Sequence, residues 1–567
     1  MNITPVLNSM AFGELTPKAM GLMGTSIYAN ACASLVNNIP LKTGGFRARP
    51  GTHYVYVDDI TPKARLLSFH DAVGTSYILA ASNLSVQPYS VSDHAIISAA
   101  METEVTTAML WELQHASSAG AMYMVHRSLN PKKIYSYSGS FSITEPAFTG
   151  DRTFDAADGR PGIVAFAGGR LFTGSTNNEP LSIFGSQIPV APTWADAYLG
   201  FDFGDGSTAD AIYLLENDML ARRLSWLTVQ RLIIGSTDQG IWQSDGSIPT
   251  PISFDMNNVS AAGAAEIQPV KIGNTVVYVS KTLKSLRALT YSDDSGGYVD
   301  TELSIYSDHL FRAGITELAV SQNPEPLLVV TIADGTVVLG SVKMIESGII
   351  AGFAKQELGG SGFVESCAVA AKASGDEIWF SVLRGATRTL EYLILDDIGG
   401  TALVDSFYID CGLALTPESE TVTGLEHLEG KAVVALGDGA VLPEKTVASG
   451  EVTYDDSVDK INIGYEYSST YQSLRPEYES NGTAQNKAKR VEKIALRLYR
   501  SLGGAVGDDA EDLQSLMYDA ETALYTGDLD MTIRGGTGPD GQFYITREDP
   551  LPLNVLAIFP RIAIMEV

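Results

Sequence analysis

The side chains most able to do chemistry form no catalytic or metal-binding signature in this sequence. None of its seven histidines stands near another histidine, a cysteine or a carboxylate at the spacing of a metal-binding helix. The hydrolase patterns G-x-S-x-G and H-E-x-x-H are also absent. His126, at the end of an apolar run, is the most suggestive histidine, and a hydrogen-bonded strand-end residue is its favoured interpretation. We therefore expect no catalytic residue, cofactor or metal ion, and predict that the chain is not an enzyme.

Two further patterns resemble ligand sites without meeting their requirements. Residues 424–432 (GLEHLEGKA) place five residues between the glycines where a phosphate loop has four, and Ala432 stands where Ser or Thr would hold Mg²⁺. A turn followed by a strand fits this segment better. Acidic clusters also occur, but none follows the calcium-loop pattern, so solvated turns are favoured over Ca²⁺ sites. The clusters are Asp202/Asp205/Asp210, Asp293/Asp294 and Asp508/Asp509/Glu511/Asp512.

One basic run stands out in an otherwise acidic chain. Its cations are Lys487, Lys489, Arg490, Lys493, Arg497 and Arg500. Read with the two-residue period of a strand, Ile494, Leu496 and Leu498 share one face, which leaves a basic face opposite. A solvated edge strand that uses Lys and Arg against aggregation is slightly favoured. The functional alternative is a contact with nucleic acid or, preferably, with an acidic neighbouring subunit.

Short apolar runs bounded by turn residues predict that the chain is mainly β. The runs are 52–57 (THYVYV), 77–81, 163–166, 232–235, 275–279, 327–332 and 377–382. Asp-Gly pairs, which supply the positive φ of a tight hairpin, begin at residues 205, 245, 334, 438 and 540. Many short strands with frequent hairpin turns allow a β-propeller, although no fixed-period repeat demonstrates one.

Helix is scarce, and three regions suggest themselves. The best helix candidate is 17–37, with Thr16 as N-cap and Pro17 at the first helical position, and a second, short helix is expected within 98–118. Residues 1–45 are expected to form a partly helical N-terminal arm without a core of its own. Residues 46–410 then form a β-propeller-like domain, and residues 411–567 form additional C-terminal β-modules.

Composition excludes several classes of protein. The 67 acidic and 38 basic residues give a formal charge of −29, so the chain lacks the basic excess of a duplex-wrapping protein. Apolar residues make up 45% and charged residues 19%, as in folded globular proteins. No membrane-spanning run and no signal peptide are visible. Three cysteines without a C-x-x-C pair fit folding in a reducing cytoplasm.

Segments spread over nearly the whole chain carry a resemblance to a known family. They begin with GELTPKAMG (13–21) and FRARPGTHYV (46–55). Six more follow in order, at 113–134, 170–186, 224–244, 284–311, 424–443 and 541–560. Together they resemble the nozzle, or tail tubular protein B, components of short-tailed phages.

The resemblance implies a structural role in a virion tail, after assembly in the host cytoplasm. Such nozzles are similar in being six-fold rings of propeller-based subunits below the portal and its adaptor ring. They retain the genome before infection and conduct it afterwards. The implied partners are further copies of the chain, the portal adaptor, and genomic DNA that passes without specific binding. Tail fibres or spikes are further candidates, although this chain is shorter than the largest family members.

Two expectations and one alternative follow from this reading. The N-terminal arm, with Glu14, Lys18, Arg47 and Arg49, is the candidate for docking onto the adaptor, and deletion of residues 1–40 is expected to abolish tail joining while leaving the ring folded. Six copies would carry 6 × (−29) = −174 formal charges, which suits a conduit wall that repels DNA. The alternative is a glycan-binding or depolymerising β-propeller enzyme on a phage surface, because two carboxylates suffice for glycoside cleavage.

Overall fold

The fold is given by a computed structural model. It describes the chain except residues 1, 56–62, 190–197, 216–220, 247–248, 346–347, 396–401, 418, 478–483, 486, 519–522 and 566–567. Its helical elements are short: α1 (Ser26–Ala29), η1 (Pro17–Ala19), η2 (Asp308–Phe311), η3 (Leu403–Asp405) and η4 (Glu426–Leu428). Nearly all other regular structure is strand, so the prediction of a mainly β chain is confirmed.

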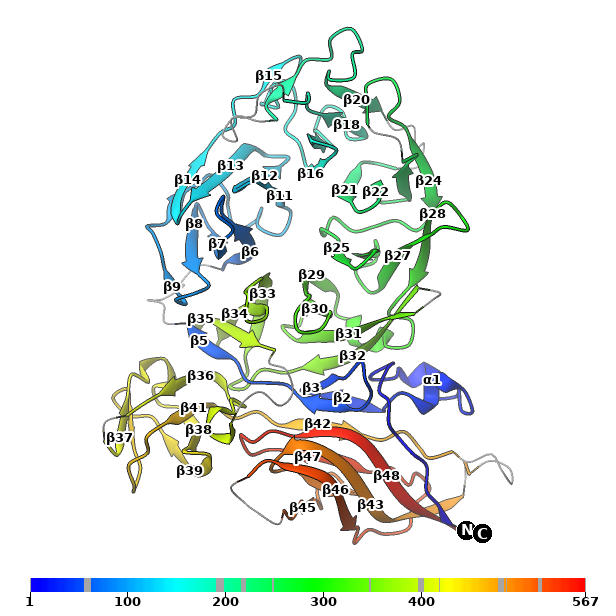
Figure 1. The fold of residues 1–567 in the computed structure, drawn as a ribbon, viewed down its shortest axis with the longest axis vertical. Coiled ribbons are helices and arrows are strands. Elements are labelled where there is room, and N and C mark those ends of the chain that lie inside the picture. Colours follow the sequence, from blue (N-terminus) through cyan, green and yellow to red (C-terminus); the bar gives the residue numbers. More distant parts are fainter. Residues whose placement is uncertain are drawn as a thin grey trace.

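Seven antiparallel blades in the described chain form a ring in the upper part of Figure 1, and the predicted β-propeller is confirmed. The first blade contains β6 (Arg65–His70), β7 (Ser76–Ser82), β8 (Ser85–Ser90) and β10 (Met101–Glu102), with β9 (Ala95–Ile96) beside β8. The second blade contains β11 (Gln114–Ser118), β12 (Ala121–His126), β13 (Leu129–Tyr137) and β14 (Ser140–Thr144). The third blade contains β16 (Ile163–Ala167), β17 (Arg170–Gly174), β18 (Ser182–Gly185) and β20 (Ile212–Leu215). The fourth contains β21 (Leu224–Val229), β22 (Ile233–Thr237), β23 (Ile241–Ser244) and β24 (Met256–Ser260). The fifth contains β25 (Val270–Ile272), β26 (Thr275–Val279), β27 (Leu286–Ser292) and β28 (Gly297–Glu302). A small parallel pair, β15 (Thr149–Gly150) and β19 (Gly200–Phe201), accompanies the third blade.

The last blade is completed by the N-terminal part of the chain. The sixth blade is β29 (Ile315–Ser321), β30 (Leu327–Ile332), β31 (Val337–Ile345) and β32 (Gly348–Gln356); the seventh is β33 (Phe363–Ala370), β34 (Glu377–Arg384), β35 (Thr387–Ile394) and β5 (His53–Val55). Because β5 pairs with β35, segments more than 300 positions apart close the ring. First strands of most neighbouring blades contact one another, as β11 does β16, β16 does β21 and β33 does β6, which places these strands innermost.

Local sequence signals explain these blades. Five of the seven predicted apolar runs lie wholly within strands. Of the other two, the run 232–235 begins one residue before β22, and the run 52–57 is a strand at 53–55, with residues 56 and 57 outside the described residues. Asp334-Gly335 connects β30 to β31, with φ of 84° at the glycine. At the turn between β38 and β39, Asp438 and Gly439 both take positive φ, 48° and 85°, as a tight hairpin requires.

Below the propeller in Figure 1 lies a β-sandwich. One sheet holds β3 (Asn38–Pro40), β4 (Phe46–Ala48), β48 (Asn554–Met565), β43 (Ala488–Ser501) and β46 (Tyr525–Thr532), with β1 (Asn2–Ile3) on β48. The other holds β2 (Ser34–Val36), β42 (Ser469–Gln472), β47 (Tyr544–Arg547), β44 (Ala505–Gly507) and β45 (Gln514–Ser515). Their shared core includes Phe46 stacked on Tyr471, with ring centroids 4.9 Å apart.

A small module sits beside the sandwich, at the lower left of Figure 1. It contains β36 (Asp410–Leu415), β41 (Ile461–Tyr465), β38 (Ala432–Gly437) and β39 (Ala440–Thr446), with the pair β37 (Thr421–Thr423) and β40 (Glu451–Thr453). Two strands join the three bodies through shared sheets. β2 pairs with β32 of the propeller and β42 of the sandwich, and β5 pairs with β35 and with β36 of the small module.

The predicted N-terminal helix is wrong over most of its length. Thr16 and Pro17 do start a helical turn, but η1 ends at Ala19, and the next helix is the four-residue α1 with Thr25 as its N-cap. Gly21 and Gly24 interrupt the segment, and the residues after α1 are drawn into β2 by pairing with β42. The structure therefore shows no helical arm.

The second expected helix, within 98–118, is also wrong. Its alanines favour helix, but 114–118 form β11, the inner strand of the second blade, and Met101–Glu102 form β10. Pairing of β11 with β12 overrides the local preference.

The N-terminal segment is also built into a core. Ile3, Met10, Cys32 and Leu35 lie at 0–4% exposure among the sandwich side chains. Deletion of residues 1–40 would therefore open the sandwich, contrary to the expectation of a folded ring without them.

Candidate functional site

The basic run lies on β43, and its alternation is confirmed. Ile494, Leu496 and Leu498 are at most 1% exposed and face the sandwich core. The interpretation as an edge strand is wrong, because β43 lies between β48 and β46. The edge is β46, which places its own acids beside the basic face.

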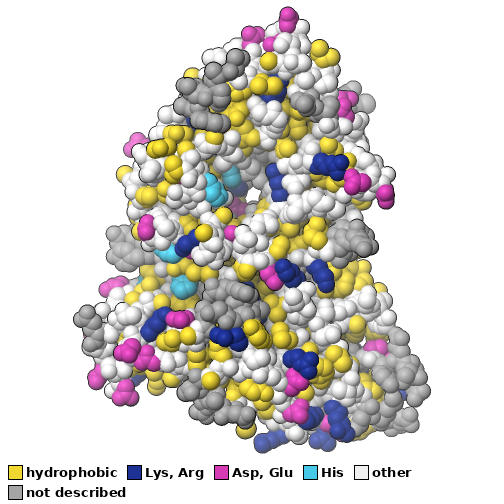
Figure 2. Space-filling view, viewed as in Figure 1, with side chains coloured by type: hydrophobic (Ala, Val, Ile, Leu, Met, Phe, Trp, Pro, Cys, Tyr) yellow, Lys and Arg dark blue, Asp and Glu magenta, His cyan; other side chains and the backbone are white. Residues whose placement is uncertain are grey.

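The cations of β43 find their acidic partners within the same chain. The Arg497 guanidinium makes two hydrogen bonds of 2.8 Å to the Asp528 carboxylate, and Lys493 Nζ lies 2.5 Å from Asp530 Oδ2. Figure 2 shows Lys, Arg, Asp and Glu side chains intermingled over this lower part of the molecule. The face is therefore charged but locally neutralised, and it offers a weaker attraction to DNA or to an acidic subunit than the sequence suggested.

The remaining basic residues of the run take separate positions. Lys489 is 1% exposed and donates to the backbone oxygen of Pro539 at 2.9 Å, and burial lowers its pKa. Its Nζ also contacts the backbone oxygen of Lys487 at 3.4 Å. Arg490 is exposed on the outer face, and Arg500 lines a cavity at the far end of the strand. The structure does not gather the six cations into one patch.

The four residues expected to dock an adaptor are mostly internal. Glu14 Oε2 accepts from the Leu35 backbone N–H at 2.8 Å, and Glu14 Oε1 lies 2.7 Å from His309 Nε2. Arg47 is 9% and Arg49 1% exposed. A docking role does not fit the burial of these three side chains. Lys18, 68% exposed and paired with Asp308, is the surface residue of the set.

Arg49 instead clamps the three bodies together. Its guanidinium makes hydrogen bonds of 3.0 and 2.8 Å to Asp410 at the start of the small module, and it stacks on Tyr467 at 4.2 Å. Asp410 also accepts from the backbone N–H groups of Thr52 and Gly359. Burial opposes ionisation of Asp410, but the charge and hydrogen bonds of Arg49 hold its pKa below the ordinary value.

The clamp continues into the last propeller blade. Thr52 Oγ1 donates to Glu391 Oε2 at 2.6 Å, and Arg384 pairs with the same Glu391 carboxylate. Arg49 and Thr52 of the N-terminal part are thereby bonded to Asp410 of the small module, and Thr52 is also bonded to Glu391 of the last propeller blade. We assign this cluster a structural role.

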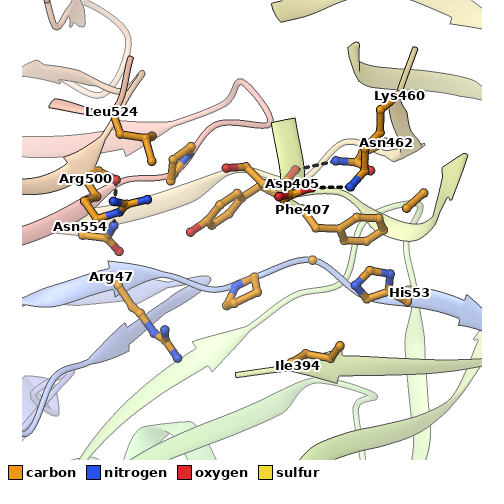
Figure 3. Close-up of a pocket in the computed structure, with 16 residues that line it drawn as sticks. Arg47, His53, Ile394, Asp405, Phe407, Lys460, Asn462, Arg500, Leu524 and Asn554 are labelled. Carbon is orange, nitrogen blue, oxygen red and sulfur yellow. Dashed lines mark hydrogen bonds and ion pairs between the residues drawn. The ribbon is translucent and has the colours of Figure 1, made fainter. Parts of the chain in front are cut away.

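A cavity of about 200 Å³ lies beside the clamp, where the three bodies meet (Figure 3). Asp405 in its wall pairs with Lys460, and Asn462 Nδ2 donates to the Ser406 oxygen at 2.9 Å. His53 stacks on Phe407 at 3.6 Å, and burial followed by the nearby His94 lowers the pKa of His53 to about 4. The polar groups of this wall serve protein contacts rather than a catalytic pair.

Hydrogen bonds connect non-neighbouring blades of the propeller. The backbone of His115, in the second blade, makes two bonds with the side chain of Gln268, just before the fifth blade. The His115 backbone N–H donates to Gln268 Oε1 at 3.1 Å, and the His115 backbone carbonyl accepts from Gln268 Nε2 at 2.8 Å. Gln114 Nε2 donates to the Ser225 oxygen of the fourth blade at 2.5 Å. Burial and then Arg65 lower the pKa of His115 to about 3, so it is neutral here.

Arginine–carboxylate pairs surround these bonds. Arg65 Nε donates to Glu317 Oε1 at 2.7 Å, and Arg127 Nη1 donates to Glu266 Oε2 at 2.8 Å. Each carboxylate is thereby held by an arginine. Neither these pairs nor Gln268 was found from the sequence, because their partners lie far along the chain.

The other residues singled out in the sequence belong to strand ends and turns. His126 ends β12, lies 3.1 Å from Glu112 Oε2 and accepts from the Ser128 N–H, as a strand-end histidine should. Ala432 begins β38 after a turn, as predicted. The Asp210 carboxylate accepts from the backbone of Gly206 and Ser207 within its turn.

The part of the chain that the structure describes holds neither a metal-type cluster nor a membrane-spanning helix. No group of three or more His, Cys, Asp or Glu side chains there is arranged to hold a metal ion. Nor does any described helix have the length and apolarity needed to cross a bilayer.

Comparisons with known proteins give a fold likeness alone. No protein-family model and no curated protein matches the chain. The β-propeller domain of Myceliophteria thermophila Cps50 (Swd1) aligns with a TM-score of 0.38 and 6% identity, over 61% of this chain and 100% of that one. Chaetomium thermophilum Raptor aligns with a TM-score of 0.37 and 8% identity, over 62% of this chain and 29% of that one. Scores this low carry no argument about function.

Proposed function

We propose that this chain is the nozzle subunit of a short-tailed phage tail, a structural virion protein. Six copies would form a ring that retains genomic DNA and conducts it into the host during ejection. The observation that carries the proposal is the ordered set of sequence segments that resemble this family. A propeller fused to further β-bodies is the architecture that the resemblance implies.

The centre of the propeller supports a path between copies rather than through a subunit. A duplex on the propeller axis would have to break the His115–Gln268 and Gln114–Ser225 hydrogen bonds. A ring of subunits supplies a separate axis without that cost. The clamp around Arg49 and Asp410 would keep each subunit rigid while DNA passes.

Net charge supports the same role. Six copies carry −174 formal charges, and a negative wall avoids the favourable phosphate contacts that would slow a moving duplex. A basic or apolar lumen would contradict this part of the proposal. The adaptor is proposed to meet the exposed surface around Lys18, with fibres or spikes as further partners.

Native mass spectrometry and negative-stain images, with and without the adaptor, test the proposal. Six-fold rings with an axial channel are expected, alone or on the adaptor. A chain that stays monomeric and ignores the adaptor would contradict it. Turnover in a polysaccharide panel would instead favour the glycan-depolymerising alternative.

A further inference from the structure

The propeller and the small module meet at His53 of β5. This residue pairs with Tyr392 of the seventh blade and also with Gly412 of the small module. The sheet of the propeller blade therefore continues into the sheet of the small module at this position. A change in the charge of His53 acts on the contact between the two bodies.

The ring of His53 is stacked on a side chain from each direction. It lies nearly parallel to Tyr392, with ring centroids 4.9 Å apart, and to Phe407, with centroids 3.6 Å apart. Phe407 belongs to the segment that leads into β36, and Figure 3 shows it beside His53 at the cavity. The backbone oxygen of Phe407 accepts from the N–H of Gly51 at 2.7 Å. The stack thus links the last blade to the start of the small module.

The next residue of β5 makes a second stack, on the opposite face of the strand. Tyr54 lies parallel to His427 of the small module, with ring centroids 3.8 Å apart. His427 Nε2 donates to the backbone oxygen of Cys411 at 3.1 Å. A stack that contains a histidine therefore ties β5 to the small module on each face of the strand.

The surroundings of His53 favour its neutral form. His94 stacks on Tyr392 at 4.0 Å and has a carboxylate partner, because Glu377 Oε2 lies 3.1 Å from its Nε2. Within the described residues, the ring of His53 has no such hydrogen bond or ion pair. Burial and then His94 lower the pKa of His53 to about 4, and Glu377 opposes them. Other titratable or charged side chains around the stack and the adjoining cavity are those of Arg47, Lys372, Asp405, Tyr408, Lys460 and Arg500.

The surroundings of His427 act in the same direction. Burial lowers the pKa of His427, and the charge of Arg384 adds to this. The hydrogen bond to the Cys411 oxygen and the carboxylates of Glu391 and Glu426 oppose the shift without reversing it. Both histidines therefore bind a proton more readily when water reaches them than when the stacks are closed.

We propose that β5 is an acid-sensitive joint, in which protonation of His53 and His427 releases the small module from the propeller while both bodies stay folded. A charged imidazole that stays in a closed stack loses its hydration, whereas the same group is solvated once the stack opens. Acid thus shifts the equilibrium toward the open joint. The joint lies within a single copy, so it does not depend on the proposed ring.

Labelling of the natural cysteines in the full chain tests the joint. Cys411, next to the Gly412 that pairs with His53, is 1% exposed. Cys32 lies in the core of the sandwich and Cys367 in the core of the propeller, both at most 3% exposed, and they serve as internal controls. Dithiodipyridine reacts with thiols in acid as well as at neutral pH. The labelling rate of each cysteine, divided by its rate in the denatured chain at the same pH, gives its protection.

The protection of Cys411 should fall at least about twenty-fold between pH 7 and pH 5, as a pKa of about 4 in the closed joint and 6.5 in the open joint requires. Cys32 and Cys367 should keep their protection. His53→Phe retains a stacked ring without its proton and should reduce the fall, and His53→Phe/His427→Phe should abolish it. His70→Phe, at an exposed position at the end of β6, should behave as the wild type.

Three results would overturn the joint. One is a protection of Cys411 that is the same at pH 7 and pH 5 in the wild type, a measurement that needs no variant. Another is an equal loss of protection at all three cysteines, which would show unfolding of the whole chain. The third is a pH dependence at Cys411 that His53→Phe leaves at its wild-type size.

Discussion

The propeller and the sandwich are built by opposite routes from the same chain. Six of the seven propeller blades fold from consecutive hairpins, and β5 completes the seventh. The sandwich instead brings residues 2–48 together with residues 469–565. The difference teaches that the propeller is a local construction, whereas the sandwich depends on both chain ends and on a clamp between distant residues.

Deletion of residues 1–40 should have the largest effect, because it should open the sandwich and leave the propeller folded. It removes β1, β2 and β3 and exposes the sandwich core around Leu35, but it leaves β5 to close the propeller. We expect hydrogen exchange to show loss of protection in β43 and β48 while β26 and β30 keep theirs. Retained protection in β43 and β48 would show that the C-terminal strands of the sandwich stay folded without the N-terminal ones.

Asp410→Asn should have the next largest effect. It leaves the Arg49 guanidinium, 1% exposed, without its anionic partner, and breaking a buried ion pair in this way costs about 3–5 kcal/mol. Chemical denaturation should show this loss in the free energy of unfolding. The double variant Arg49→Met/Asp410→Leu should recover part of it, because no unpaired charge remains. An unchanged stability of Asp410→Asn would remove the clamp from the account.

Acid should lower the stability of the region where the propeller, the sandwich and the small module meet, because His53 lies there and becomes protonated. Its folded pKa of about 4 lies below the ordinary 6.5, so the unfolded chain binds more protons between these values. The stability that neutral His53 contributes is complete above pH 6.5 and is lost as the pH falls toward 4, by at most about 1.4 kcal/mol per pH unit.

His53→Phe keeps an aromatic ring in the stack and removes the titration. Its melting temperature should therefore fall less than that of the wild type between pH 7 and pH 5, for the reason given above. His70→Phe, at an exposed position at the end of β6, is the matched control and should follow the wild type. Identical pH profiles for all three chains would contradict a proton-linked role for His53.

Arg497→Gln should have the smallest effect. The Arg497–Asp528 pair is about half exposed on both sides, and such surface pairs add little to stability. Denaturation curves of the variant and the wild type should coincide within error. A clear loss of stability would show that the charged face of β43 helps to hold the sandwich together.

Much of the propeller was predictable because its signals are local. The runs 275–279 and 327–332 are buried strands, β26 and β30, and the Asp334-Gly335 turn joins β30 to β31. The helix expected at 17–37 failed because pairing with β42, more than 400 positions away, decides the conformation of residues 34–36. Local propensity does not contain that information.

The candidate sites also divide into features that the local sequence predicts and features that depend on distant residues. The alternation of β43 was readable, and so was the matching alternation of acids at Asp528 and Asp530, a signal that sequence reasoning passed over. The partnership of Arg49 with Asp410 was not readable, because 361 positions separate them. Four charged residues near the N-terminus therefore suggested a docking surface, whereas three of them, Glu14, Arg47 and Arg49, belong to the interior.

A reconstruction of the assembled ring with DNA in transit tests the central claim most directly, that DNA passes between copies and not through a subunit. The account predicts DNA density on the symmetry axis of a six-membered ring, with the His115–Gln268 pair still spanning each propeller. DNA density along a propeller axis, or no closed ring at all, would contradict it.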